Sequence, residues 1–432
     1  MRQLRAFAPI VNDAEINDYI QHLGFKLVEN NRNAENRQFS FFVIHQNSIN
    51  AFALPGGYIG VHTGLITRTE TESELASVLG HEIAHVTQRH LARRLELNKQ
   101  LSIPRLAAFA AAILIASQAK NTETGMGALM GAQGLAQQAL INHTRSNEAE
   151  ADRIGITTLY ESGFDPAGVI SFFEKMQTNQ RYSPNAYEFL RTHPLSRSRI
   201  TDARLRANEY PAKNVQDRPV YALIKEKIKA LTAKITPVSI NAMQVRHKKG
   251  EINTSAQLYG YAIFMIRAKK FDEAEKILKS LLFSDNKQAS YAVALAQLNI
   301  ERETPESSIK EIKTFLVQSP GNQALVETLA ELLLAQGSFV EAREILLENI
   351  HMTKYAPYLL KLLSEAQEGS GHKSEVYETE GNFLLAMGDL SGARMQFEQA
   401  LNSQTEDPYA RARINAQINE IRQTIKQRSL RH

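Results

Sequence analysis

Small residues recur with a fixed period in the second half of this chain, and this period constrains the fold more than any other sequence feature. Ala274, Ser308 and Ala342 lie 34 residues apart, each near the start of a helical segment. Gly388–Ala393 restarts the pattern, which leaves room for an extra helix around Tyr355–Glu368. A helix–turn–helix unit of this length cannot bury its apolar face alone, so consecutive units must stack. The spacing therefore predicts an α-solenoid.

A 34-residue helix–turn–helix period is typical of tetratricopeptide repeats. We interpret residues 252–432 as four degenerate repeats, with a helical tail of accidental spacing as the alternative. Such arrays bind peptide or protein segments on a concave face, so this half is expected to be an interaction module. A polar connector at 208–251 separates it from a first domain at 1–207.

The first domain is expected to combine helices with a small β-sheet. Segments dense in Phe, Val and Ile are separated by turn residues and predict three short strands: Phe39–Gln46, Ile49–Leu54 and Tyr58–Leu65. Helical patterns follow to about residue 207. The predicted fold class is therefore mainly α, with an α+β first domain and a C-terminal α-solenoid.

The most informative short motif is His-Glu-Ile-Ala-His at His81–His85. Residues four apart lie one above the other on a helix, so His81 and His85 can direct two imidazoles at one metal ion. Glu82 lies close enough to reach a water at that ion. Two neutral nitrogen ligands and a carboxylate base are what zinc-assisted peptide hydrolysis requires, with one Zn²⁺ per chain. A capping box at Thr71–Glu74 and apolar residues at helical spacing place the motif inside a helix.

A third ligand must come from later in the chain. Glu148 and Asp152 share one helical face, whereas Glu150 points away from them. Glu148 as a ligand and Asp152 as a hydrogen-bond partner of a ligand histidine fit the chemistry of zinc sites. Gly155 would let two helices approach closely. An acidic helix start that favours the macrodipole is the alternative for these carboxylates. His90, nine residues from His81, is expected to face away from the metal.

These motifs together resemble a known family. His81–His85 with Glu148 and Asp152 is similar to the gluzincin peptidases related to HtpX and the CAAX prenyl proteases, as are Asn50–Gly57 and Thr192–Pro194. The added repeat half resembles the periplasmic BepA-like branch, over nearly the whole chain. The resemblance implies Glu148 as the third ligand and Glu82 as the general base. It also implies a protease, and in part a chaperone, of unfolded or stalled outer-membrane β-barrel proteins.

The same resemblance implies a periplasmic location and a partner, the outer-membrane β-barrel assembly machinery, that the repeats would contact. Members of that branch carry an N-terminal secretion signal. None is visible here, which we interpret as truncation.

His193 is ambiguous from sequence. A lone histidine before proline is usually a loop residue. By resemblance, His193 stabilises the oxyanion or occupies a fourth metal position and keeps the enzyme latent. A ligated fourth position would exclude the nucleophilic water, so we hypothesise that His193 gates activity.

Composition narrows the chemistry further. The chain has no Cys among 432 residues, which excludes a thiol nucleophile, a Cys-based zinc site and disulfides. The net charge is +4, and the basic residues are interspersed with acidic ones, so nucleic-acid binding is not expected. The uncharged stretch Leu106–Ala116 is too short to span a bilayer. It is expected to form one arm of a hairpin, Ile103–Ile141, near the active site, with peripheral membrane contact as the alternative.

Two further points stay open at this stage. The strand Ile49–Leu54, or the Gly56–Val61 edge, would receive substrate as an added β-strand, with a fully paired hairpin as the alternative. The competing function is a repeat-based binding or chaperone protein whose zinc is latent or structural. A membrane-bound prenyl-type peptidase is a third reading, and the lack of a bilayer-length segment argues against it.

Overall fold

The computed structural model describes residues 8–99, 122–180, 188–211, 215–353, 356–403 and 407–429. It divides into two compact units. The N-terminal unit is Tyr19–Tyr221, and the C-terminal unit is Met1–Asp18 together with Ala222–His432. Within the described ranges, no helix has the length and apolar character needed to cross a membrane. The apolar stretch Leu106–Ala116 lies outside the described residues.

A three-stranded sheet organises the N-terminal unit. Its strands are β1 (Ser40–Ile44), β2 (Ala51–Leu54) and β3 (Tyr58–His62), in the order β1-β3-β2. β1 runs parallel to β3 and β2 antiparallel to it. The predicted strands are confirmed with shorter ends. The suggestion that Gly56–Val61 offers an edge is wrong, because the β2–β3 hairpin brings β3 back between its two neighbours.

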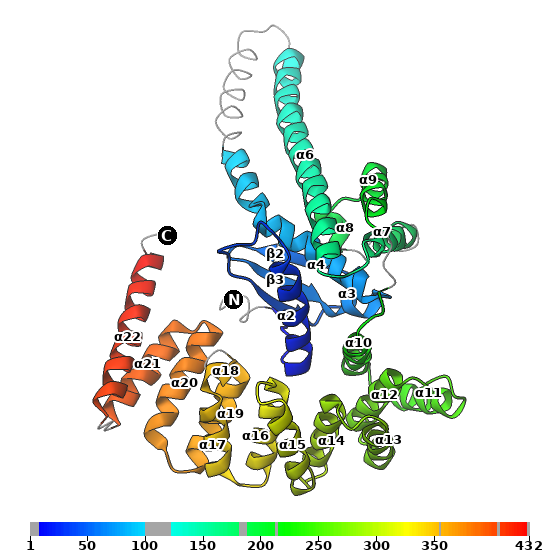
Figure 1. The fold of residues 1–432 in the computed structure, drawn as a ribbon. Helices are drawn as coiled ribbons and strands as arrows, with labels where there is room; N and C mark the ends of the chain where they lie inside the picture. Colours follow the sequence, from blue (N-terminus) through cyan, green and yellow to red (C-terminus); the bar gives the residue numbers. More distant parts are fainter. Residues whose placement is uncertain are drawn as a thin grey trace. The chain divides into compact units, whose positions relative to one another are not determined.

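Helices of this unit pack in succession onto the sheet (Figure 1). They are α2 (Ala14–Glu29), α3 (Thr63–Arg68), α4 (Glu72–Thr87), α6 (Thr122–Glu161), α7 (Ala167–Gln180), α8 (Glu188–Thr192) and α9 (Arg197–Asn208), and residues 90–99 are also helical. α4 packs on β2 and β3, and α6 and α7 pack on α4. Thr71 caps α4 by accepting a hydrogen bond from the Glu74 amide. The Glu74 carboxylate accepts from the amide of Glu70 rather than Thr71, so the predicted capping box is only half formed.

Two glycines set the crossing of α4 and α6. A Cβ on Gly80 would lie 3.3 Å from the carbonyl oxygen of Gly155, and a Cβ on Gly155 would lie 3.1 Å from the amide of His81. The predicted close approach at Gly155 is therefore confirmed. α4 is buried on nearly every side, including its polar residues His81 and Glu82. Buried polar groups must be paired, so the partners of His81 and Glu82 determine the chemistry that these side chains can carry out.

The C-terminal unit is a succession of antiparallel helix pairs (Figure 1). Its helices are α10 (Pro219–Thr232), α11 (Pro237–Lys248), α12 (Ser255–Arg267), α13 (Phe271–Ser284), α14 (Ala289–Glu301), α15 (Glu306–Gln318), α16 (Gln323–Ala335), α17 (Phe339–Glu348), α18 (Ile350–Thr353), α19 (Pro357–Gly369), α20 (Lys373–Met387), α21 (Leu390–Asn402) and α22 (Pro408–Ser429). The small residues that defined the period are fully buried where the helices pack, among them Ala274, Ser308 and Ala342. α19 is the predicted extra helix.

The mainly α fold class with a helical C-terminal region is thus confirmed. α10 and α11 lie within the stretch 208–251 that was expected to be a connector. The domain bounds drawn from the sequence remain a prediction.

A buried lysine pairs with two acidic residues at the beginning of α2, within the C-terminal unit. Lys227 is 3% exposed, and its ammonium lies 2.8 Å from the Asp13 carboxylate and also binds Glu15. Burial opposes a charge there, but Glu15 and the other neighbours outweigh it and raise the pKa of Lys227 well above its usual range. The Tyr259 hydroxyl donates to Glu15 as well. A buried charge is tolerated when it is paired in this way.

Candidate metal centre

Four side chains from three segments converge beside the sheet. His81 and His85 come from α4, Glu148 from α6, and His193 from the residue after α8. One ligand atom from each lies within 4.8 Å of all the others. The Nε2 atoms of His81 and His85 are 2.9 Å apart. Two imidazoles and a carboxylate on facing helices form a donor set that suits a divalent transition metal.

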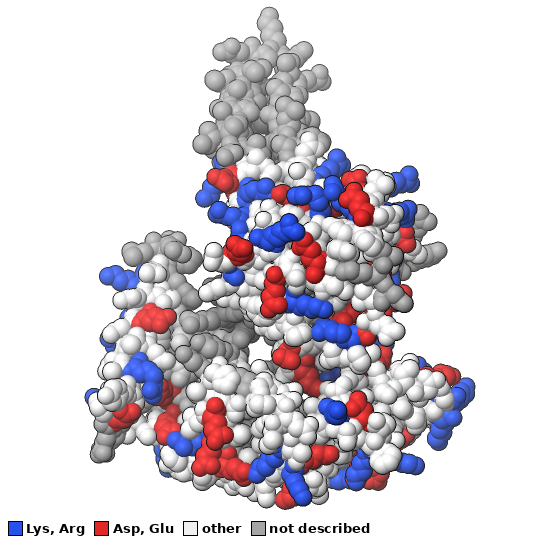
Figure 2. All heavy atoms as spheres, viewed as in Figure 1, with Lys and Arg blue, Asp and Glu red and all other residues white. Residues whose placement is uncertain are grey.

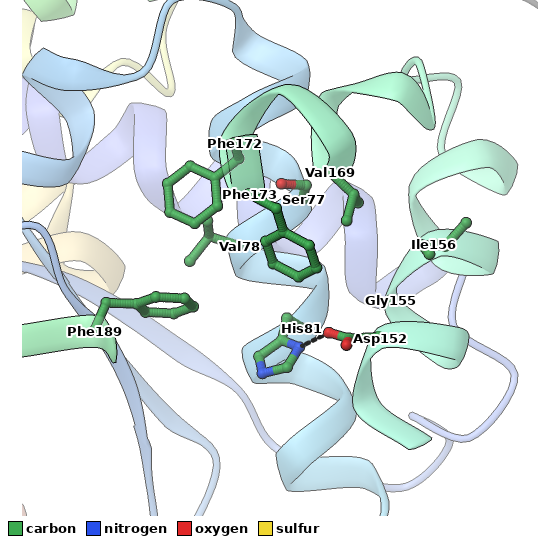
Figure 3. Close-up of a pocket in the computed structure, with 10 residues that line it drawn as sticks. All are labelled: Ser77, Val78, His81, Asp152, Gly155, Ile156, Val169, Phe172, Phe173 and Phe189. Atoms are coloured by element: carbon green, nitrogen blue, oxygen red, sulfur yellow. Dashed lines mark ion pairs between the residues drawn. The ribbon is translucent and has the colours of Figure 1, made fainter. Parts of the chain in front are cut away.

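His81 is oriented by a carboxylate behind it. Its Nδ1 lies 3.0 Å from the Asp152 carboxylate, as the dashed line in Figure 3 marks. Asp152 in turn accepts two hydrogen bonds from the Arg199 guanidinium, at 2.7 and 2.8 Å. The ring of His81 lies at one end of an apolar wall formed by Phe172, Phe173 and other side chains (Figure 3). This places Asp152 where the sequence expected a partner of a ligand histidine.

Arg199 was missed by the sequence reasoning. It is 6% exposed, lies in the first turn of α9, and also reaches a Glu148 carboxylate oxygen at 2.8 Å. It therefore ties the two carboxylates of α6 together. One weak signal was available, because a cation in the first turn of a helix opposes the macrodipole and needs a compensating partner.

The pKa values of the cluster depart from ordinary values in different directions. Burial opposes protonation of His81, but hydrogen bonds to Asp152 and Glu148 outweigh it and raise its pKa to about 10. Burial and the charge on His81 lower the pKa of His85 well below its usual range. Burial likewise opposes ionisation of Glu148, yet His193 and His81 hold its pKa low. A metal ion bound at His81 Nε2 would take the place of a proton on that nitrogen.

Glu82 stands apart from the ligand set. It is 1% exposed, and its Oε1 atom has no hydrogen-bond partner among the described residues, although the His193 Nε2 lies 3.3 Å away. Burial raises the pKa of Glu82. A buried carboxylate oxygen without a donor is costly unless a water or ion completes its environment. This carboxylate oxygen is therefore open to a hydrogen bond from a molecule that enters the site.

His193 is held in the cluster by its backbone and its ring. Its amide donates to the Phe189 carbonyl, and its ring stacks on the Phe189 ring at 4.8 Å. The Nδ1 atom lies 3.2 Å from both Glu148 carboxylate oxygens and 3.2 Å from His81 Nε2. The sequence left His193 either a loop residue or, by resemblance, a group at the metal. The fold buries it among the ligand candidates.

His90 contradicts its prediction. It does not face away from the metal centre, because its Nδ1 lies 2.8 Å from Nδ1 of His85. The prediction assumed one continuous helix. α4 ends at Thr87, and Arg89 adopts a positive φ of 55°, so the next helical residues start in a new direction. The helical phase between His81 and His90 is thereby lost.

A cleft of about 690 Å³ opens onto the cluster. Residues of β2, including Phe52 and Leu54, form one wall, and helical residues such as Val86 and Leu91 form another. Glu82, His85 and His193 lie at its floor. Large concave sites with a few convergent polar groups are typical of substrate-binding sites.

Comparison with known proteins agrees with this geometry. The family model described as Peptidase family M48 matches residues 14–207. The putative beta-barrel assembly-enhancing protease of Vibrio cholerae is 36% identical over 98% of this chain and 87% of that protein. The beta-barrel assembly-enhancing protease of Escherichia coli is 34% identical over 98% of this chain and 86% of its own length. The mitochondrial metalloendopeptidase OMA1 of Schizosaccharomyces pombe is 31% identical over 38% of this chain and 45% of its own length.

The chain is therefore a metallopeptidase of family M48. Within that family it belongs with the beta-barrel assembly-enhancing proteases, whose similarity extends over nearly its full length. The family resemblance inferred from the motifs is confirmed, and so is the assignment as a metal-dependent peptidase.

Proposed function

We propose that this protein is a zinc endopeptidase that cleaves unfolded or misassembled outer-membrane β-barrel proteins in the periplasm. The observation that carries the proposal is the convergence of His81, His85 and Glu148, with Glu82, His85 and Glu148 lining an open cleft. The names of the relatives in Vibrio cholerae and Escherichia coli support the link to β-barrel assembly.

The donor atoms favour zinc as the single metal per chain. Two imidazole nitrogens and one carboxylate, with a further position open to water, form the usual catalytic zinc set. The Oε1 atom of Glu82 supports the fit, because it is buried 3.3 Å from His193 Nε2 and has no hydrogen-bond partner among the described residues, so it can accept from such a water. A bound zinc ion would polarise the scissile carbonyl and acidify a water molecule.

The chain's own residues supply the remaining steps. His81, His85 and Glu148 hold the ion, and Asp152 keeps the ring of His81 in place. Glu82 accepts a proton from the attacking water and delivers it to the leaving amine nitrogen. Its raised pKa suits a group that must both accept and return a proton.

We propose that substrate binds by adding a strand to β2. It is the edge strand of the described sheet on the side of the cleft. The Asn50 carbonyl accepts from the His62 amide, so by alternation the backbone groups of Ala51 and Ala53 point away from β3. The Ala53 amide already hydrogen-bonds the Glu82 carboxylate, so the proposal concerns the backbone groups of Ala51 and the Ala53 carbonyl. An extended segment of substrate could pair with them, and such main-chain pairing tolerates many sequences. Unassembled β-strands are clients of that kind.

The repeat half is proposed to recruit the partner. We interpret α12–α21 as degenerate tetratricopeptide repeats that contact the β-barrel assembly machinery or its clients. Mixed acidic and basic side chains cover the drawn face of the described residues and agree with protein rather than nucleic-acid partners (Figure 2). Peripheral membrane contact through 103–141 stays a secondary proposal.

Glu82→Gln tests the catalytic proposal. The variant should retain bound zinc and the wild-type unfolding temperature, while cleavage of an unfolded β-barrel protein falls by about 10²–10⁴-fold because the general base is lost. Cleavage is followed by gel electrophoresis with and without a zinc chelator. Glu96→Gln, an exposed carboxylate of the helical segment 90–99, is the matched control. Undiminished cleavage by Glu82→Gln would refute the assignment.

A second function is favoured by His193, which lies within the ligand cluster. On this alternative the protein mainly binds or chaperones its clients, and its metal centre is held idle. A variant without cleavage that still restores β-barrel assembly in cells would support the alternative. Full dependence of assembly on Glu82 would exclude it.

A further inference from the structure

We infer that His90 is a positioning residue for the metal ligand His85, acting at the head of a hydrogen-bonded chain that runs through Glu150 to Arg93. The inference rests on the proposed function in one respect, namely that His85 binds the metal. No role had been assigned to these three residues from the sequence, and none of them belongs to the ligand cluster.

The chain is continuous and its contacts are short. The Nδ1 atoms of His85 and His90 are 2.8 Å apart. The Nε2 atom of His90 lies 3.1 Å from the Glu150 carboxylate, and an Arg93 guanidinium nitrogen lies 2.6 Å from the same oxygen. His90 is 4% exposed, whereas Glu150 and Arg93 are progressively closer to solvent. This chain of hydrogen bonds thus leads from the partly buried ligand His85 to a more exposed charged pair, Glu150 and Arg93.

A metal ion at His85 would fix which nitrogen carries the proton in each of the two imidazoles. His85 must present a bare Nε2 to the ion, so its proton resides on Nδ1 and is donated to His90. His90 then has a bare Nδ1 and carries its proton on Nε2, which donates to Glu150. The same Glu150 oxygen that accepts from His90 also accepts from the Arg93 guanidinium at 2.6 Å. Each nitrogen in the chain has one role, and the reverse assignment would place a proton against the metal.

The two ligand histidines are supported by equivalent devices. His81 is backed directly by Asp152, which Arg199 clamps. His85 is backed by Glu150, which Arg93 clamps, with the ring of His90 inserted between them. The chain on this side is longer because His90, which follows the end of α4 at Thr87, lies between His85 and Glu150. In zinc sites, groups that hold a ligand imidazole in place raise metal affinity.

Two substitutions of His90 separate hydrogen bonding from volume. His90→Gln places a carbonyl oxygen that can accept from His85 and an amide that can donate to Glu150. His90→Phe fills the space and provides neither group. Glu150→Ala leaves the ring of His90 in place and removes its acceptor, so it tests the chain if His90→Phe does not fold. Glu96→Ala is the control for a lost exposed carboxylate.

The primary measurement is zinc affinity of the full chain, by competition with a chromophoric chelator, with unfolding temperatures of the metal-free proteins recorded alongside. We expect His90→Phe to weaken zinc binding by about 10- to 100-fold, Glu150→Ala by a smaller factor, and His90→Gln to stay near wild type. The ¹⁵N chemical shifts of His85 should report a proton on Nδ1 in the zinc-bound wild type.

Unchanged affinity in a folded His90→Phe variant would overturn the inference, as would equal weakening by His90→Gln and His90→Phe. If His90→Phe does not fold, wild-type affinity in Glu150→Ala would overturn it. Failure of the wild-type protein to bind zinc would instead refute the proposed function, so the two failures are distinguishable.

Discussion

At the scale of single residues, the metal centre depends on side chains that never need to touch the metal. Asp152 contacts His81 and is itself bound by Arg199. His90 contacts His85 and is itself paired with Glu150. The sequence indicated His81, Glu82 and His85 because their spacing is local to one helix. Arg199 contacts a residue far away in the sequence, and His90 is separated from its partner by a helix break. No rule of residue spacing identifies such contacts.

His193 offers a test at this scale. If it gates the site, His193→Ala should raise the kcat for unfolded substrate several-fold and weaken zinc binding, because a competing imidazole and a ligand are removed together. Steady-state cleavage assays and chelator competition give both quantities, with the exposed His45→Ala as control. A fall in kcat would favour the oxyanion role instead. No change in either quantity would contradict the gate.

At the scale of elements, the crossing of α4 and α6 decides whether the two halves of the ligand set meet. His81 and His85 lie on one helix and Glu148 on the other, and their distance is set where Gly80 faces Gly155. Periodicity predicted both helices. Their close approach was suggested by Gly155, although only the packed structure identifies Gly80 as its counterpart.

Gly155→Val should separate these helices. The added side chain would meet the His81 backbone, and such overpacking costs about 1–3 kcal/mol of unfolding free energy. Zinc affinity should fall along with it, since Glu148 moves away from the histidines. Denaturant unfolding and chelator competition measure the two effects. Gly321→Ala, at a glycine with open space around it, should change neither. Wild-type zinc affinity in Gly155→Val would show that the crossing does not set the site.

At the scale of the whole molecule, stability should depend on pH through a carboxyl group of the C-terminal unit. Burial raises the pKa of Glu327 on α16 to about 7, with Glu331 contributing in the same direction. Between the ordinary pKa of 4.5 and about 7, the folded state therefore binds more protons than the unfolded state. Stability should be highest below this window and fall as the pH rises through it.

Glu327→Gln should remove this dependence. The variant would gain on the order of 1–3 kcal/mol relative to wild type at pH 8 and little at pH 4.5, because its side chain carries no charge to desolvate. Urea unfolding at several pH values gives the comparison, and the exposed Glu348→Gln is a control away from Glu327 and Glu331. Parallel pH profiles for Glu327→Gln and wild type would contradict the prediction.

The sequence by itself determined what is local in this protein. The helix that carries His81, Glu82 and His85, the short strands, the 34-residue period and the extra helix α19 all follow from side-chain spacing over one or two turns or repeats. The family could be inferred from such motifs as well, because they keep their order along the chain.

Only the tertiary structure decided what depends on contacts between distant segments. It placed β3 in the centre of the sheet and β2 at its edge, brought His193 against Glu148, and recruited Arg199 and His90 to orient the ligands. The physical reason is that burial of a charged or polar group requires a partner within hydrogen-bond distance. Helix packing determines which residue becomes that partner. The spacing of residues along a single helix does not predict it.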